Sequence, residues 1–346
     1  MDFTPTEEQR AAAELAAQIF GDLSSHERLG AAGTATDAEL WKALCTSGLV
    51  AAVEEVGLLG LVLLLEEQGR TTAQVPLAAT AVYGILALAR HGSEAQRAEL
   101  LPALGDGTAV ATGAFPARGT VRAADGRLTG TVPAVPWLRD ATHVLVPDDD
   151  RALWLVRTAD ARTEPVETTA PWAAGRLTLD GTAAEPFGGP GAYDEVLATA
   201  RTAFAGLQAG VCAGSLARAV AYTSTREQFG RPLSSNQGVM LRAADAHMDT
   251  EAIRVTAYEA GWRTDAGLPA REHALTAAWW AAEAGVRVVH AGQHLHGGMG
   301  ADLDHPVHRH FLWGRQLAAH LGCGAELLAE LGEVLAAAPT PAKEQA

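Results

Sequence analysis

The alanine-rich half of the chain, from residue 192 onward, limits the fold more than any other feature of the sequence. Apolar residues recur there with the 3.6-residue period of an α-helix. Turns that contain glycine, proline or aspartate divide this pattern into four long segments, at 192–228, 235–264, 269–294 and 305–334. Helices of this length bury their apolar faces against one another, so the sequence predicts a four-helix bundle over residues 192–335.

The first hundred residues carry repeated signals for helix starts. Thr4, Pro5 and Glu7 supply a hydroxyl N-cap, a proline at the first helical position and a glutamate three residues after the cap. Asp37 and Ser93 are the predicted N-caps of two later helices, and Pro102 is predicted to end the second of them. The segment therefore reads as a helical domain over residues 1–104, with further helices predicted at 37–48, 56–67, 78–89 and 93–102.

Between residues 105 and 191 the pattern changes to short β-favouring pieces separated by glycine, proline and threonine. They are predicted to form an antiparallel sheet, with Asp148–Asp150 as one tight connection; the pieces lie at 120–122, 143–146, 153–156 and 176–179. The predicted fold class is therefore mainly α with a small β domain. The expected order is a helical domain (1–104), a β domain (105–191), the four-helix bundle (192–335) and a frayed tail (336–346).

Charge and cysteine content exclude several classes of function. The chain has 26 Lys and Arg against 41 Asp and Glu, a formal charge of −15, so we expect no nucleic acid partner. Three widely spaced cysteines without a CxxC pair suit a reducing, cytoplasmic location. The first residues lack a basic stretch followed by an apolar run, and so do not predict a secretion signal. The most apolar stretch, 56–65, covers only half of the ~20 residues that span a bilayer, so a buried helix is expected and no membrane.

Two segments in the C-terminal half are more specific than the rest of the chain. One runs from Tyr222 to Leu233 and contains Arg226 and Phe229; the other runs from His294 to Gly300. An arginine beside a turn offers two parallel donors to a pyrophosphate, and glycines let backbone N–H groups approach the same anion.

Together with the pieces at 2–9 and 92–102, these segments resemble the acyl-CoA dehydrogenase family. Members of that family place an R-x-x-F-G turn and a G-G-x-G turn at the two ends of the bundle.

The resemblance implies an FAD-dependent oxidoreductase that acts on an acyl-CoA thioester. In family members the adenosine diphosphate half of the flavin reaches into the bundle of a neighbouring subunit. Carried over position by position, the resemblance assigns this nucleotide to Arg226, Gln228, Phe229, Gly297 and Gly298. His294 stands where the family usually has a glutamine that contacts the nucleotide, and is a changed contact.

The positions where the family carries its catalytic base hold residues that cannot accept a proton. The family reaction removes a proton from the carbon α to the thioester and passes a hydride from the β carbon to the flavin. One base position is Leu321 and the other is Ala200, which makes Arg201 the family's recurrent arginine. We expect Arg201 to shape the acyl-CoA end of the bundle or an interface. Glu195 and Glu227 are expected to be surface or turn residues, so no catalytic residue is assigned. The loss of a positioned base lowers the reaction rate by about 10²–10⁴-fold.

The flavin-ring side departs from the family as well. Ala114–Gly119 offers no hydroxyl before Thr120, where the family carries a Thr-Glu-Pro…Gly-Ser segment. Two prolines in 132–137 remove strand donors from a piece that ends in Trp137, which either stacks on a partner or only packs. This pattern resembles the smaller, degenerate subunit of actinobacterial heteromeric (α2β2) acyl-CoA dehydrogenases of sterol catabolism. It implies a homologous catalytic partner subunit that supplies the base, and a bulky or sterol-derived acyl group.

Two alternatives stay open at this point. One is a self-sufficient flavoenzyme of secondary metabolism with a displaced base, which would be yellow when purified alone. The other is a metal-dependent hydrolase built on six histidines between residues 290 and 310. The H-x-H spacing places neighbouring histidines on different helix faces and no H-E-x-x-H occurs, so no metal ligand is assigned.

Overall fold

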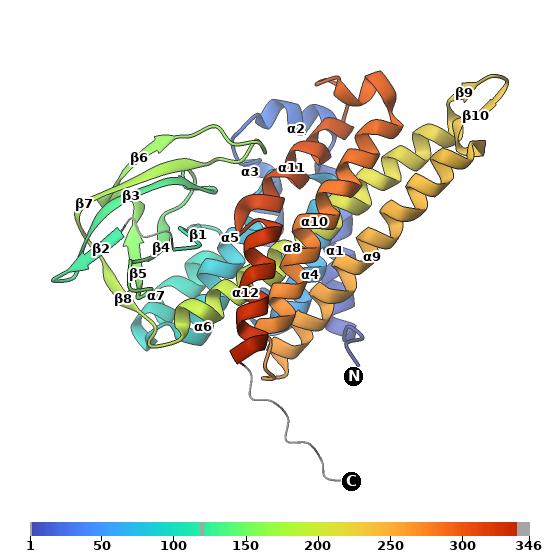
Figure 1. Ribbon diagram of the computed structural model, residues 1–346. Helices are drawn as coiled ribbons and strands as arrows, with labels where there is room; N and C mark the ends of the chain where they lie inside the picture. The colour runs from blue at the N-terminus through green and yellow to red at the C-terminus, as the bar shows by residue number, and fades with distance from the viewer. Residues whose placement is uncertain (1, 118–120, 338–346) are drawn as a thin grey trace, which may run out of the picture.

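The computed structural model describes residues 2–117 and 121–337, and it shows a helical body with a β domain on one side (Figure 1). The predicted fold class, mainly α with a small β domain, is confirmed. The strands of the β domain lie to the left of the view, and the longest helices run side by side toward the upper right. Thr120 and most of the predicted tail, 338–346, lie outside the described residues.

The N-terminal part is helical, as predicted, but its capping differs in detail. The first helix is capped by Thr6, not Thr4, because the Thr6 hydroxyl and the Gln9 side chain form a reciprocal capping box. The predicted caps Asp37 and Ser93 are confirmed. Its elements are α1 (Glu7–Leu23), α2 (His26–Ala32), α3 (Ala38–Thr46), α4 (Val53–Thr71), α5 (Leu77–Ala79), the π-helical η1 (Thr80–Leu86), α6 (Ala87–His91) and α7 (Glu94–Gly105).

Two further predictions for this part are wrong. Pro102 does not end its helix but lies inside α7, where the N–H of Asp106 donates to the Pro102 carbonyl and closes the last turn. The single helix predicted over 78–89 contains the π-helical turn η1 between two short α-helices.

The β domain consists of two four-stranded sheets. One has the order β1 (Ala111–Gly113), β4 (His143–Pro147), β5 (Leu153–Arg157), β8 (Glu185–Phe187), and the other β2 (Val121–Ala124), β3 (Arg127–Val135), β7 (Gly175–Ala183), β6 (Arg162–Pro165). The single antiparallel sheet of the prediction is therefore wrong, and β1 pairs parallel with β4. The register of β3 shifts between Val132 and Val135, around Pro133, which has no N–H to donate. The tight connection at Asp148 is confirmed, since its carboxylate accepts from two backbone N–H groups.

The bundle is formed by α8 (Ala192–Thr225), α9 (Gln237–Asp265), α10 (Arg271–Leu295), α11 (Val307–His320) and α12 (Gly324–Ala337). The predicted fourth helix is thus two helices, which separate at Gly322, where φ is 124°. Ala336 and Ala337, predicted to be tail, belong to α12. α8 is long and apolar enough to span a membrane, but 72% of its most apolar window is buried among the other helices.

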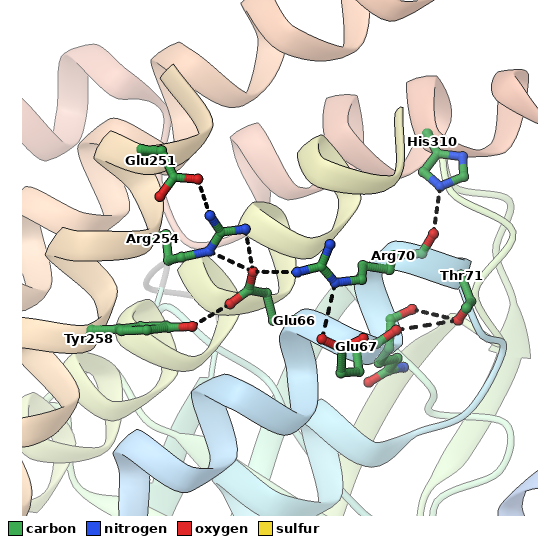
Figure 2. A network of polar contacts seen from close by, with 9 residues as sticks. Glu66, Glu67, Arg70, Thr71, Glu251, Arg254, Tyr258 and His310 are labelled. Carbon is green, nitrogen blue, oxygen red and sulfur yellow. Dashed lines mark hydrogen bonds and ion pairs between the residues drawn. The ribbon is translucent and has the colours of Figure 1, made fainter. Parts of the chain in front are cut away.

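Two sets of polar contacts connect α4 to α9. At one end, the chain turns at Gly57 (φ 72°), and the Asp265 carboxylate accepts from the N–H groups of Leu58 (2.8 Å) and Leu59 (2.9 Å). A side chain at 57 would collide with that carboxylate, so the close approach requires glycine. At the other end, Glu66 is buried against Arg254 and Tyr258 of α9, as Figure 2 shows.

Candidate functional site

A hairpin after α8 carries three of the residues assigned to the nucleotide. Its strands are β9 (Glu227–Gln228) and β10 (Arg231–Pro232), and the turn residues Phe229 and Gly230 both have positive φ, 56° and 75°. Such a two-residue turn suits glycine but strains a bulky residue. Phe229 is nevertheless fully exposed, at the tip of a hairpin that extends beyond the helices in Figure 1. Strain at an exposed aromatic residue makes the tip of this hairpin a candidate contact surface.

The donors on this hairpin are free to bind a ligand. The backbone N–H of Arg226 caps α8 by donating to the Tyr222 carbonyl at 2.8 Å. The Arg226 side chain is exposed and forms no hydrogen bond or ion pair with any residue in 2–117 or 121–337. The Gln228 side chain is likewise exposed and unpaired within these residues. The guanidinium is therefore available to an anion.

The glycine turn follows α10, in the short 3₁₀ helix η4 (Gly297–Ala301). Gly297 has a φ of 61°, which favours glycine, and a Cβ at either Gly297 or Gly298 would meet no other atom within 4 Å. Packing therefore does not explain Gly298. His294 lies exposed one turn earlier, on the last turn of α10.

The hairpin and the glycine turn lie at the same end of the bundle. His296 is buried beside Gly297 and stacks on Tyr222, four residues before Arg226, with ring centroids 4.9 Å apart and an interplanar angle of 22°. The expectation that the two turns occupy the two ends of the bundle is wrong. α8 and α10 are separated by one antiparallel helix, so they run in the same direction and end together.

Both base positions are packed inside the protein. Ala200 is fully buried in α8, and Leu321 is 5% exposed after the end of α11. The cavity beside Leu321 measures about 20 Å³ and is bounded by Arg201 and Phe204. That volume holds one water molecule at most and cannot hold an acyl chain.

Neither nearby glutamate replaces the base. Glu195 is half-exposed and pairs with Arg90 at 2.5 Å on the surface. Glu227 lies exposed on the hairpin, at the other end of α8. Among the residues that the structure describes, these positions match the surface and turn roles expected from the sequence.

Arg201 forms an ion pair within this chain. Its guanidinium is 7% exposed and binds Glu330 of α12 bidentately, with Nη1–Oε1 2.9 Å and Nη2–Oε2 2.6 Å. Burial alone would raise the pKa of Glu330, but the hydrogen bonds and charge of Arg201 outweigh burial and hold that pKa below its usual range. Sequence reasoning missed Glu330, because one glutamate in an amphipathic helix carries no signal of its partner.

The flavin-ring side is poor in hydrogen-bonding side chains. A cavity of about 250 Å³ lies between the β domain and α11, and Gln316 and His320 are the polar side chains among its described lining residues. The Gln316 side-chain oxygen already accepts from the backbone N–H of Thr169. Arg118, Gly119 and Thr120 lie outside the described residues. Trp137 is fully buried and stacks on Trp172, with centroids 4.5 Å apart, so it packs the domain interior.

The histidines between 290 and 310 do not converge on one point. His310 is buried under α4, where burial lowers its pKa to about 4, and its Nε2 lies 2.9 Å from the Arg70 carbonyl oxygen. His290 stacks edge-on against Phe311. Across 2–117 and 121–337 no three His, Cys, Asp or Glu side chains are grouped as a metal site would require.

Two family models match most of the chain. Residues 6–108 match the acyl-CoA dehydrogenase N-terminal domain, and residues 188–333 match the acyl-CoA dehydrogenase C-terminal domain. The chain is 36% identical over 376 aligned positions to acyl-CoA dehydrogenase FadE27 of Mycobacterium tuberculosis (strain ATCC 25618 / H37Rv). That match covers 98% of this chain and 100% of the relative.

Solved structures agree with the family models. One chain of a structure described as the Tcur3481-Tcur3483 steroid ACAD G363A variant is 41% identical, with a TM-score of 0.90, over 95% of this chain and 98% of that one. A chain of the ChsE4-ChsE5 complex from Mycobacterium tuberculosis is 33% identical, with a TM-score of 0.92, over 98% and 100%. Butyryl-CoA dehydrogenase of Megasphaera elsdenii, 21% identical over 97% and 100%, shares the fold with a TM-score of 0.86. The chain therefore belongs to the acyl-CoA dehydrogenase family of flavoproteins.

Proposed function

We propose that this chain is the non-catalytic subunit of a heteromeric, FAD-dependent acyl-CoA dehydrogenase. The observation that carries the proposal is the packing at both base positions: Ala200 is a fully buried alanine, and Leu321 is a buried leucine beside a cavity of about 20 Å³. A chain without a base at these positions depends on another subunit for deprotonation.

The residues at the hairpin end fit the adenosine diphosphate half of the flavin. Arg226 supplies a free guanidinium, and Gly297 and Gly298 leave open space in front of the turn. Bidentate donation from arginine and backbone N–H groups in a turn both suit a pyrophosphate. His294, exposed on α10, takes the place of the family's glutamine toward the nucleotide. When bound, the flavin supplies a hydride acceptor; the ring-side cavity of this chain offers it few donors among the described residues.

Two observations support a homologous partner subunit. Phe229 is fully exposed in a strained turn beside the nucleotide residues. The ChsE4-ChsE5 structure is described as a complex, and the Tcur3481-Tcur3483 structure as a steroid ACAD. We accordingly propose a bulky, steroid-like acyl-CoA as the substrate of the assembled enzyme, and a cytoplasmic location that keeps the three free cysteines reduced.

Flavin content tests the proposal. The chain purified alone should lack the yellow absorption of bound flavin, and the complex with its partner subunit should show it. In that complex Arg226→Ala should lower bound flavin, whereas Arg10→Ala, at an equally exposed and unpaired arginine on α1, should not. A chain that alone holds a full complement of flavin and reduces a dye with an acyl-CoA would instead be the self-sufficient enzyme.

A further inference from the structure

Three charged side chains from three helices meet between the packed base positions and the surface. Arg201 of α8 and Arg271 of α10 both contact Glu330 of α12; the Arg271 Nη2–Oε1 distance is 3.5 Å. Arg201 is buried, Glu330 is 30% exposed and Arg271 is half-exposed. The ion pairs therefore run from the interior to the surface.

The rest of α12 is held by an apolar seam. Leu327 is 2% exposed and, with Leu331 and Val334, packs against Leu275 and Ala278 of α10. Glu330 adds one ion pair to α8 through Arg201 and one to α10 through Arg271. α12 is therefore tied to both helices.

The two arginines line different cavities. One, about 20 Å³, is lined by Arg201 and Leu321. The other, about 260 Å³, is lined by Arg271 together with Asp194 and Leu268. Glu330 bridges the arginine of one cavity to the arginine of the other.

We propose that Arg201, Glu330 and Arg271 form a clamp that holds α12 closed over the acyl-CoA slot of this chain, so that this subunit takes up no thioester. The inference rests on the proposed function, which identifies that slot. An acyl chain that entered would displace Glu330 and leave the Arg201 charge buried without its counter-ion, a costly state in a protein interior. The clamp thus explains why the complex would contain one working site for each pair of unlike subunits.

Amide hydrogen exchange tests the clamp, measured on the full chain alone and on its complex with the partner subunit. Glu330→Gln should accelerate exchange in α12 by about tenfold, because hydrogen bonds to a charged group are lost. Glu333→Gln is the matched control: Glu333 is on the same helix, exposed, and without an ion pair among the described residues. Arg271→Gln, a safer change at a half-exposed residue, should give an acceleration of about threefold. Equal exchange in Glu330→Gln and Glu333→Gln would refute the clamp.

Octanoyl-CoA, measured by equilibrium dialysis, tests the closure. The natural chain alone should retain no octanoyl-CoA, and its complex should retain one octanoyl-CoA per pair of unlike subunits. The Glu330→Gln variant, alone and in the complex, should retain more than the corresponding natural protein. Natural chain that binds octanoyl-CoA without reducing a dye would overturn the clamp but leave the proposed function standing. Binding together with dye reduction by the chain alone would overturn both. Fast α12 exchange in Glu330→Gln with no gain in octanoyl-CoA binding would show that the ion pairs hold α12 without closing a slot, and would also overturn the proposal.

Discussion

Neutralising Glu66 should be among the most damaging polar substitutions in this chain. Its side chain is 4% exposed and accepts from Arg254 (Nε 2.7 Å, Nη2 2.6 Å) and from the Tyr258 hydroxyl (2.6 Å), with Arg70 at 3.2 Å (Figure 2). Burial by itself would lower the pKa of Arg254, but Glu66 reverses this and raises it. Glu66→Gln keeps the shape and removes the charge, which leaves Arg254 without its buried counter-ion.

We expect Glu66→Gln to lower the free energy of unfolding by about 3 kcal/mol, the usual cost of breaking a buried ion pair from one side. Urea denaturation measures this loss. Glu67→Gln is the control one residue away: its side chain is 23% exposed and pairs with Arg70, which is 41% exposed. A surface pair of this kind contributes about 0–1 kcal/mol. If both variants lose the same stability, burial is not what gives the Glu66 contacts their strength, and the reasoning fails.

Three further outcomes can be measured on the same protein. Burial lowers the pKa of His310 to about 4 in the folded chain, so the unfolded chain takes up a proton at a higher pH than the folded chain does. The free energy of unfolding should therefore fall by up to about 3 kcal/mol as the pH drops from 6.5 to 4. The pH-dependent part of that loss should be smaller in His310→Gln than in His308→Gln. Cys323 is exposed, whereas burial raises the pKa of Cys45 to about 11 and raises that of Cys212, so a thiol reagent should modify one cysteine in the native chain and all three in urea. Leu321→Glu should yield no dye reduction by the chain alone and should destabilise it by about 2–4 kcal/mol, because the carboxylate would be buried beside a cavity of about 20 Å³; measurable turnover would contradict this.

Local signals predicted most of the helical architecture. Ser93 with Gln96, and Asp37 with Leu40, form the caps that their spacing indicates, because capping depends on residues three positions apart. The first cap lies two residues after the predicted one. Thr4 and Thr6 each stand three residues before a side chain that suits a capping box, Glu7 and Gln9, and only the structure distinguishes them. The division of the last helix at Gly322 was missed because the apolar period continues across it.

Long-range pairings could not be predicted in the same way. The family resemblance identifies Arg201 by counting back from Arg226, but its partner Glu330 lies 129 residues later and has no distinguishing neighbours. The stacking of His296 on Tyr222, which places both nucleotide segments at one end, likewise joins residues 74 positions apart. Neither contact follows from periodicity, because periodicity fixes which face of a helix is buried and not which residue it meets.

Under the proposed function, the residues assigned to the nucleotide and the positions that lack a base lie far apart along one helix. Ala200 and Arg201 sit in the first third of α8, and Arg226 follows its last residue. At 1.5 Å per residue, the 25 positions from Arg201 to Arg226 place them about 38 Å apart. Over that distance, substitutions without shared contacts act independently. Under the proposed function, the packing of the base positions by Ala200 and Leu321 therefore leaves the geometry of the hairpin intact. One end of the bundle can then lack its own chemistry while the other end serves the cofactor of a neighbouring subunit.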